Sequence, residues 1–179
     1  DDSFEFFLNF IKTVHEAGCN TFIIHARKAW LKGLSPKENR DIPPLNYERV
    51  LELKKLMPNL NISINGGIKT LEHAKELLTQ LDGVMIGRAA YENPWMLKEA
   101  DSLIYNTQDP IWKNRKELLT AYLPYVEQEL SQGCPLTIIT RHLSSLFNGI
   151  PGSRKYRQML SEQAPKAKDG VELLQKAMA

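Results

Sequence analysis

The 179-residue sequence has few cysteines and no long apolar run. Its two cysteines, Cys19 and Cys134, lie too far apart to suggest a disulfide framework, and the four histidines lack the spacing of metal ligands. No window approaches the roughly 18 apolar residues of a transmembrane helix, and the N-terminal Asp1-Asp2-Ser3 resembles no signal peptide. We therefore expect no metal site, no membrane contact, reduced thiols and a cytoplasmic location.

Charge is divided unevenly along a chain of otherwise ordinary globular composition, 42% hydrophobic and 25% charged. Residues 1–110 hold 13 Lys and Arg against 15 Asp and Glu, a net charge of −2, whereas residues 111–179 hold 10 against 6, a net charge of +4. A modest excess of this kind is often only a solvated surface. It permits a nucleic-acid partner without requiring one.

Hydrophobic patterning predicts alternating helices and strands up to about residue 100. An amphipathic helix, with Asp2 and Glu5 resembling a capping box, ends at Ala17-Gly18. Two further helices begin near Asn46 and at Thr70, the second with an apolar stripe that runs to Leu81. Short β-favouring runs at Thr21–Ile24, Asn61–Ile64 and Gly83–Ile86 predict strands. This alternation indicates parallel strands with crossover helices.

Three strands are too few to close a (β/α)₈ barrel, which needs roughly 250 residues. We therefore expect the C-terminal part of a longer protein that lacks roughly the first five βα units. The predicted fold class is α/β, the C-terminal part of a TIM barrel followed by an all-α bundle. Residues 1–100 would form the partial barrel with its last three strands, 101–110 a linker and 111–179 the helical domain.

Two consecutive strand-to-helix turns carry the pattern of a phosphate site. Asn65-Gly66-Gly67 follows one predicted strand and Gly87-Arg88 follows the next. Glycine lets the main chain approach an anion closely, and the guanidinium suits phosphate oxygens. In barrels the loops after the last strands bind phosphate in this way. The alternative is that these glycines only make tight turns before helices.

Basic residues gather in two further places. His25 directly follows a predicted strand, and the loop after it holds Lys37 and Arg40 with Trp30, a mixture that suits an RNA backbone and a stacked base. In the helical part, a helix capped by Ser153 would place Arg154 and Arg157 one turn apart on one face. Each has a simpler interpretation: His25 would be a structural histidine, the loop would be merely soluble, and the two arginines would belong to a solvated helix face.

Several segments resemble the A subfamily of tRNA-dihydrouridine synthases, and the resemblance spans nearly the whole chain in order. They are His25–Arg40, Ile42–Leu45, Ser63–Lys69, Asp82–Arg88 and, in the helical part, Gly149–Arg154. The resemblance implies a flavin-bearing barrel with a helical tRNA-binding domain, in which NADPH reduces FMN and hydride then passes to a uridine of the tRNA D-loop. The product is 5,6-dihydrouridine, and a cysteine on an active-site loop protonates the uracil ring.

Carried over by position, the resemblance implies roles for ten residues. Those expected to hold FMN are His25, Asn65, Gly66, Gly67, Gly87 and Arg88, and those expected to orient tRNA are Lys37, Arg40, Arg154 and Arg157.

The family's cysteine motif has no match at Cys19 or Cys134. We therefore expect no catalytic residue in this chain and no turnover by it alone. Its exposed sheet edges would pair with a missing N-terminal half or with another copy. Two alternatives stay open: another FMN-dependent TIM-barrel oxidoreductase acting on a small metabolite, and a non-catalytic RNA-binding module.

Overall fold

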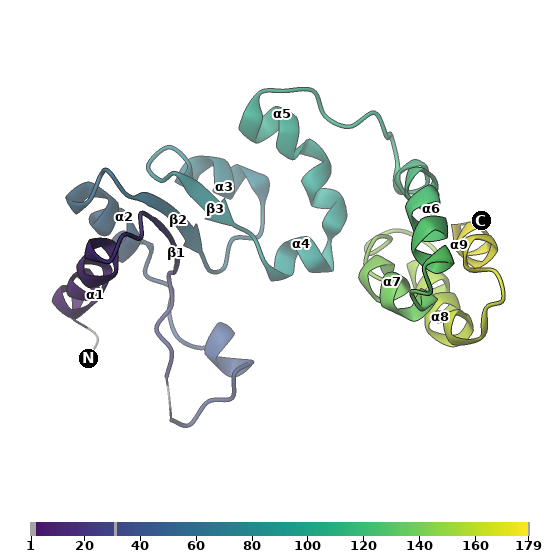
Figure 1. Ribbon diagram of the computed structural model, residues 1–179, viewed down its shortest axis with the longest axis horizontal. Coiled ribbons are helices and arrows are strands. Elements are labelled where there is room, and N and C mark those ends of the chain that lie inside the picture. The colour runs from purple at the N-terminus through teal and green to yellow at the C-terminus, as the bar shows by residue number, and fades with distance from the viewer. Residues whose placement is uncertain (1–2, 31, 179) are drawn as a thin grey trace. The chain divides into compact units, whose positions relative to one another are not determined.

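The computed structural model describes residues 3–30 and 32–178, and the chain forms two compact units, Asp1–Gly87 and Arg88–Ala179 (Figure 1). Asp2, the expected helix cap, and Leu31, part of the loop motif, lie outside the described residues. Within those ranges the first unit contains the three strands, and the second contains helices joined by turns and loops.

The first unit is a parallel sheet with helices between its strands. Its elements in chain order are α1 (Phe4–Glu16), β1 (Thr21–His25), the 3-10 helix η1 (Glu38–Arg40), α2 (Tyr47–Leu56), β2 (Asn61–Asn65), α3 (Leu71–Leu77) and β3 (Gly83–Met85). The strand order is β1-β2-β3, and both neighbouring pairs are parallel. The predicted α/β class with a parallel sheet is confirmed.

Polar side chains cap the three α-helices of this unit. Ser3, Asn46 and Thr70 each accept a hydrogen bond from the backbone N–H three residues later, which satisfies a donor that the helix itself leaves unpaired. Helix α3 ends at Leu77, before its apolar stripe does, because the next turn tightens into 3-10-type hydrogen bonds. Leu81 is nevertheless buried, so the predicted stripe faces the core.

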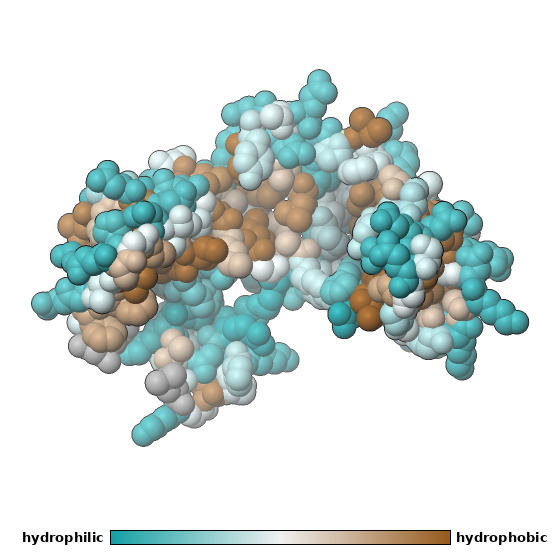
Figure 2. Space-filling view, viewed as in Figure 1, coloured by the Kyte–Doolittle hydropathy of each residue, from teal (hydrophilic) through white to brown (hydrophobic). Residues whose placement is uncertain are grey.

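The two faces of the sheet differ in burial. Phe22, Ile24, Ile62 and Ile64 alternate along β1 and β2 on the buried face, and α2 packs against β2. On the other face Ile23 is 59% exposed, and Figure 2 shows apolar side chains over the strands of this unit. An open apolar face of this kind marks a surface that binds a ligand or further structure.

The described residues of the second unit form helices joined by turns and loops. Its elements are α4 (Arg88–Glu92), the 3-10 helix η2 (Pro94–Glu99), α5 (Ala100–Tyr105), α6 (Arg115–Ser131), α7 (Leu136–Leu143), α8 (Ser153–Gln163), the 3-10 helix η3 (Ala164–Lys166) and α9 (Gly170–Met178). Helix α5 occupies the first half of the segment 101–110 that was expected as a linker. Pro124 lies inside α6.

The core of the second unit comes from the apolar stripes seen in the sequence. Its buried members are contributed by α6, α7, α8, α9 and the segments between them, namely Leu119, Leu123, Val126, Leu136, Ile139, Leu146, Phe147, Tyr156, Leu160, Ala164, Leu173 and Leu174. Because Leu119, Val126 and Leu174 are fully buried, α6 and α9 are fixed against each other.

One ion pair ties the starts of β2 and β3 to α2. The Lys54 ammonium lies 2.7 Å from an Asp82 carboxylate oxygen and also donates to the carbonyls of Pro58 and Leu60. The same carboxylate accepts a 2.7 Å hydrogen bond from the Ile62 N–H. That hydrogen bond, together with Lys54, lowers the pKa of Asp82 below its ordinary value.

Replacing Asp82 with Asn should therefore destabilise the first unit by about 1 kcal/mol at pH 7, a modest amount because the pair is partly exposed. A folded-state pKa below the unfolded value means that the stabilisation is present above about pH 4 and is lost as the pH falls through the folded-state pKa. Urea unfolding at several pH values would measure both effects. The exposed Glu52 on α2 supplies a matched control, Glu52→Gln, and equal losses in the two variants would contradict the assignment.

Candidate functional site

The carboxyl ends of the three strands lie in register at one edge of the sheet. His25 pairs with Asn65, and Asn65 pairs with Met85. The His25 Nδ1 lies 3.2 Å from the Asn65 carbonyl oxygen, so in the neutral ring Nδ1 carries the proton and Nε2 is left as an acceptor. His25 is the last residue of β1 rather than the first after it, and its side chain is exposed.

The glycine turn after β2 packs tightly against its neighbours. Gly66 and Gly67 have φ angles of 121° and 69°, where side-chain-bearing residues are strained. A Cβ on Gly66 would lie 3.0 Å from His25 Nδ1, and one on Gly67 would overlap Leu45. The Tyr47 hydroxyl donates a 2.5 Å hydrogen bond to the Gly66 carbonyl. The positive φ angles therefore favour glycine at both positions, and a Cβ at either would also force neighbouring side chains to move.

Tyr47 is a positioning residue that sequence patterns did not reveal. Burial raises the pKa of its hydroxyl above the ordinary value, an effect that nearby Arg27 partly opposes. The hydroxyl therefore stays protonated and donates at neutral pH. Nothing in the sequence distinguished it from an ordinary residue on the apolar face of a helix.

The glycine after β3 has a different environment. A Cβ built on Gly87 would meet no heavy atom within 4 Å, and its φ lies outside the left-handed range. Packing within the described residues therefore does not explain why glycine stands there. Arg88 follows directly as the first residue of α4 and belongs to the second unit.

The basic loop after β1 is held by its own polar residues. The Arg27 guanidinium donates to the carbonyls of Asp41, at 3.0 Å, and Pro43. The Asn39 side chain bonds both the N–H and the carbonyl of Trp30. Arg27 is thus a structural residue of this loop whose head group is occupied by backbone carbonyls.

Lys37 and Arg40 lie at the two ends of the 3-10 turn η1 in this loop, and both side chains are exposed. Ser35 and Glu38 form a reciprocal capping pair at the 3-10 turn η1 between them, which lowers the pKa of the Glu38 carboxyl. The Arg40 N–H donates to the Lys37 carbonyl at 3.1 Å. The two cations therefore sit on one ordered turn.

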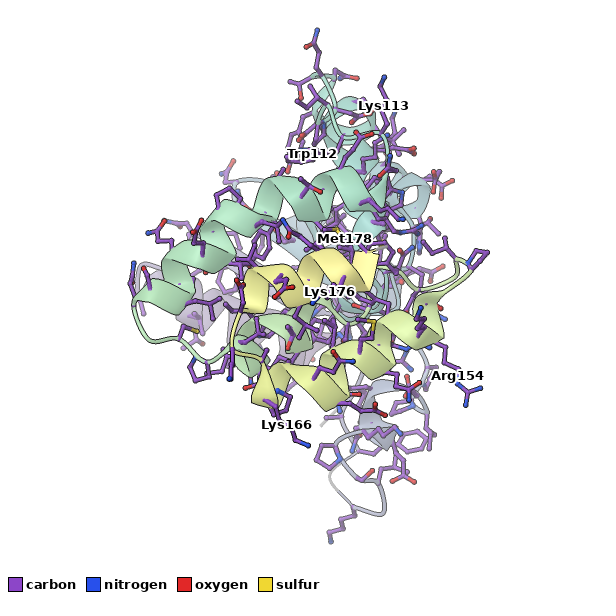
Figure 3. The ribbon with its side chains drawn as sticks, turned by 90° about the vertical axis from the view of Figure 1, so that its right-hand side faces the viewer. Trp112, Lys113, Arg154, Lys166, Lys176 and Met178 are labelled. Atoms are coloured by element: carbon purple, nitrogen blue, oxygen red, sulfur yellow. The ribbon has the colours of Figure 1, made fainter. Side chains whose placement is uncertain are left out.

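In the second unit Arg154 and Arg157 lie on the first turns of α8, and both are exposed. The expected cap was wrong by one residue, because Gly152, at a φ of 86°, occupies the N-cap and Ser153 is the first helical residue. Arg157 donates a 2.5 Å hydrogen bond to Asn148, whose amide donates to the Glu92 carbonyl. The Arg154 side chain extends away from the bundle (Figure 3).

Helix α8 is fixed beneath these arginines by Tyr156. Its buried hydroxyl donates to the Leu143 carbonyl at 3.2 Å, and its ring packs on Phe147. Burial raises the pKa of Tyr156 well above its ordinary value, so the donor is kept at all physiological pH values.

The described residues contain neither a cluster of metal ligands nor a membrane-spanning helix. Over 3–30 and 32–178 the structure brings no three metal-ligating side chains together. In the same residues it has no helix long and apolar enough to span a bilayer.

Comparison with known proteins decides the family. The profile described as dihydrouridine synthase matches residues 1–179. The chain belongs to the dihydrouridine synthase family. This confirms the resemblance drawn from the loop and glycine motifs.

Curated relatives are 51–54% identical to this dihydrouridine synthase chain over the residues that align with it. The tRNA-dihydrouridine(20/20a) synthase of Yersinia pestis is 54% identical over 99% of the chain and 52% of its own length. Those of Vibrio cholerae and Escherichia coli K12 are 51% and 53% identical over 99% of the chain, which covers 54% and 51% of their lengths. The chain thus spans about half the length of the curated relatives it matches.

The packing of the glycine turn predicts a specific pattern of stability loss in this dihydrouridine synthase chain. Gly67→Ala should cost about 2 kcal/mol of unfolding free energy, because a positive φ is combined with overlap on Leu45. Gly18→Ala is the matched control, since Gly18 has a φ of 104° but no atom near a built Cβ.

In a Leu45→Ala background the cost of Gly67→Ala should fall towards that of the control, because only backbone strain is left. Urea denaturation of the four variants and the wild type measures the cycle. Equal costs at Gly67 and Gly18 in the wild-type background would contradict the packing argument.

Proposed function

We propose that this chain supplies the FMN phosphate site and the tRNA-binding surface of an FMN- and NADPH-dependent tRNA-dihydrouridine synthase that reduces D-loop uridine to 5,6-dihydrouridine. The observation that carries the proposal is the alignment of three parallel carboxyl ends, with His25 beside the Gly66-Gly67 turn, in a chain matched throughout by this family. In parallel sheets ligands bind at that edge.

The residues at this edge fit the phosphate end of FMN. Because Gly66 and Gly67 lack a Cβ, a ligand can approach their main chain at this edge of the sheet. The open space at Gly87 also admits a ligand atom. On the sequence pattern we assign the phosphate's fixed cation to Arg88 and a polar contact to Asn65. The chemistry that bound FMN would supply is hydride transfer from NADPH to the uracil ring.

The chain's own contribution to that reaction is positioning. The hydrogen bond from Nδ1 to the Asn65 carbonyl fixes the His25 ring with Nε2 as its available acceptor. Tyr47 holds the Gly66 carbonyl and so keeps the turn in its left-handed conformation. We assign His25 to a contact with the flavin.

We further propose that the sheet is the last part of a (β/α)₈ barrel completed by residues outside this chain. The exposed sheet face with Ile23 and Met85, 59% and 45% exposed, supports this, because in a closed barrel that face lines the interior. Residues 111–179 would serve as the helical tRNA-binding domain. Until the barrel is completed, the exposed face and edges favour pairing with the other half or with another copy.

We propose that neither cysteine of this chain protonates the substrate. Cys19 precedes β1, so about 13 Å of strand separates it from the carboxyl edge, and its thiol donates to the Thr21 carbonyl. Cys134 lies in the second unit before α7. We therefore propose that the proton donor comes from outside this chain and that the chain alone does not turn over.

A chimera tests these assignments. In it the chain replaces the matching residues of the Yersinia pestis tRNA-dihydrouridine(20/20a) synthase. The chimera should purify with FMN and form dihydrouridine in tRNA, whereas the isolated chain should do neither. Cys19→Ser and Cys134→Ser should leave the chimera's rate within about twofold, and Arg88→Ala should lower its FMN content at least tenfold. Formation of dihydrouridine by the isolated chain would contradict the proposal.

The tRNA assignment has its own test in the chimera. Lys37→Glu/Arg40→Glu and Arg154→Glu/Arg157→Glu should each weaken tRNA binding at least tenfold and reduce the slope of log Kd against log salt. Lys12→Glu/Lys75→Glu, on the exposed sides of α1 and α3, makes the same charge change as a control. If the enzyme acts on a small metabolite instead, none of the three pairs of substitutions should change tRNA binding. RNA binding without FMN or turnover would indicate a non-catalytic module instead.

A further inference from the structure

A cavity of about 570 Å³ lies within the second unit and is lined by residues of η2, α6, α8 and α9 and of the segments that lead into α6 and α8. Figure 3 shows α9 between α6 and α8, with the C-terminal end of α9 on the same side as the N-terminal ends of the other two. A volume of this size accommodates a nucleotide. None of the ten site residues assigned above lines it.

The lining is strongly cationic. It includes Lys113, Arg115, Lys116, Lys155 and Lys176, and none of the described residues that line the cavity is acidic. Lys176 is paired with Glu172, at 2.6 Å, just outside the lining. Glu117 is also nearby, where its carboxylate caps α6 through the Lys113 N–H and the Asn114 amide.

Three of the lysines have no counterion in the described part of the chain. Lys113, Lys116 and Lys155 have exposed side chains, and no ion pair of theirs is recorded among residues 3–30 and 32–178. Like charges held around one cavity repel one another, and an anion between them relieves that repulsion. The arrangement therefore favours a ligand with phosphate charge.

Arg115 adds an unsatisfied donor to this cluster. Its guanidinium carbon lies 5.4 Å from the centre of the Trp95 ring, a cation–π arrangement. Its Nε is buried without a hydrogen-bond partner among the described residues. A buried N–H without an acceptor is unfavourable, and the described residues leave this donor unsatisfied.

The floor of the cavity is apolar and aromatic. Phe147, Met159 and Met178 line it beside the buried ring of Tyr156. A cationic rim above an apolar floor matches the two parts of a nucleotide, its phosphate and its base. The charge alone would suit any anion, but the floor favours one that carries a flat apolar group.

We propose that this cavity binds a single unpaired nucleotide of RNA, its phosphate on Lys113, Lys116 and Lys155 and its base on the apolar floor. The choice of RNA over a free nucleotide rests on the proposed function, because Lys155 adjoins Arg154 on α8, one of the assigned tRNA cations. The preference for a phosphate-bearing nucleotide rests only on the cavity itself.

Methyl NMR of the 179-residue chain, labelled at the methionine methyl groups, tests the proposal. Met159 and Met178 report on the cavity, and Met57 in the first unit is an internal control. A single-stranded oligouridylate should shift the two cavity methyls but not that of Met57, and the affinity should fall with salt. Uridine, which lacks phosphate, should bind at least tenfold more weakly than UMP.

Charge variants give the second readout. Lys113→Glu/Lys116→Glu should weaken the oligouridylate-dependent shifts at least tenfold, whereas Lys166→Glu/Lys168→Glu, at the opposite end of α8, should change them less than twofold. Equal effects of the two pairs, or equal binding of uridine and UMP, would overturn the cavity assignment. Shifts with UMP but none with the oligomer would overturn the RNA source. Neither result depends on FMN binding or turnover, so failure here is distinguishable from failure of the proposed function.

Discussion

The parallel register of β1, β2 and β3 is the constraint on which the candidate cofactor site depends. Because His25 pairs with Asn65 and Asn65 with Met85, the three strands end together, and whatever follows each strand begins at the same edge. A shift of one residue would reverse the side chains of a strand and bury His25 on the helix side. The buried Ile62 and Ile64 oppose such a shift, because they would then leave the core.

Glycine has two separate roles at this edge. At Gly66 and Gly67 the positive φ angles already favour glycine, and the close His25 and Leu45 side chains add to this, so these residues serve the fold whether or not a ligand is bound. At Gly87 the described neighbours impose no such demand. A substitution at Gly66 or Gly67 would therefore disturb the fold as well as any binding, whereas one at Gly87 would test the phosphate assignment more directly.

The second unit pairs a well-filled core with an unevenly charged surface. Fully buried residues such as Leu119 and Leu174 fix α6 and α9, while Lys113, Lys116 and Lys155 stand together at one end of the helices without acidic partners in the described chain. The net charge of +4 over residues 111–179 is therefore partly concentrated rather than spread over the surface. Concentrated positive charge is what distinguishes a polyanion-binding surface from a merely soluble one.

The sequence by itself determined the order of elements, their parallel arrangement and the family. Short β-favouring runs such as the one from Thr21 to Ile24 indicate a strand, and caps such as Asn46 and Thr70 are local signals that act within a few residues. Only the tertiary structure decided that Arg27 donates hydrogen bonds to carbonyls of its own loop and that Tyr47 holds the Gly66 carbonyl. The same is true of the five cations that line one cavity. These facts depend on side chains distant in sequence meeting in space, which local propensity and periodicity do not encode.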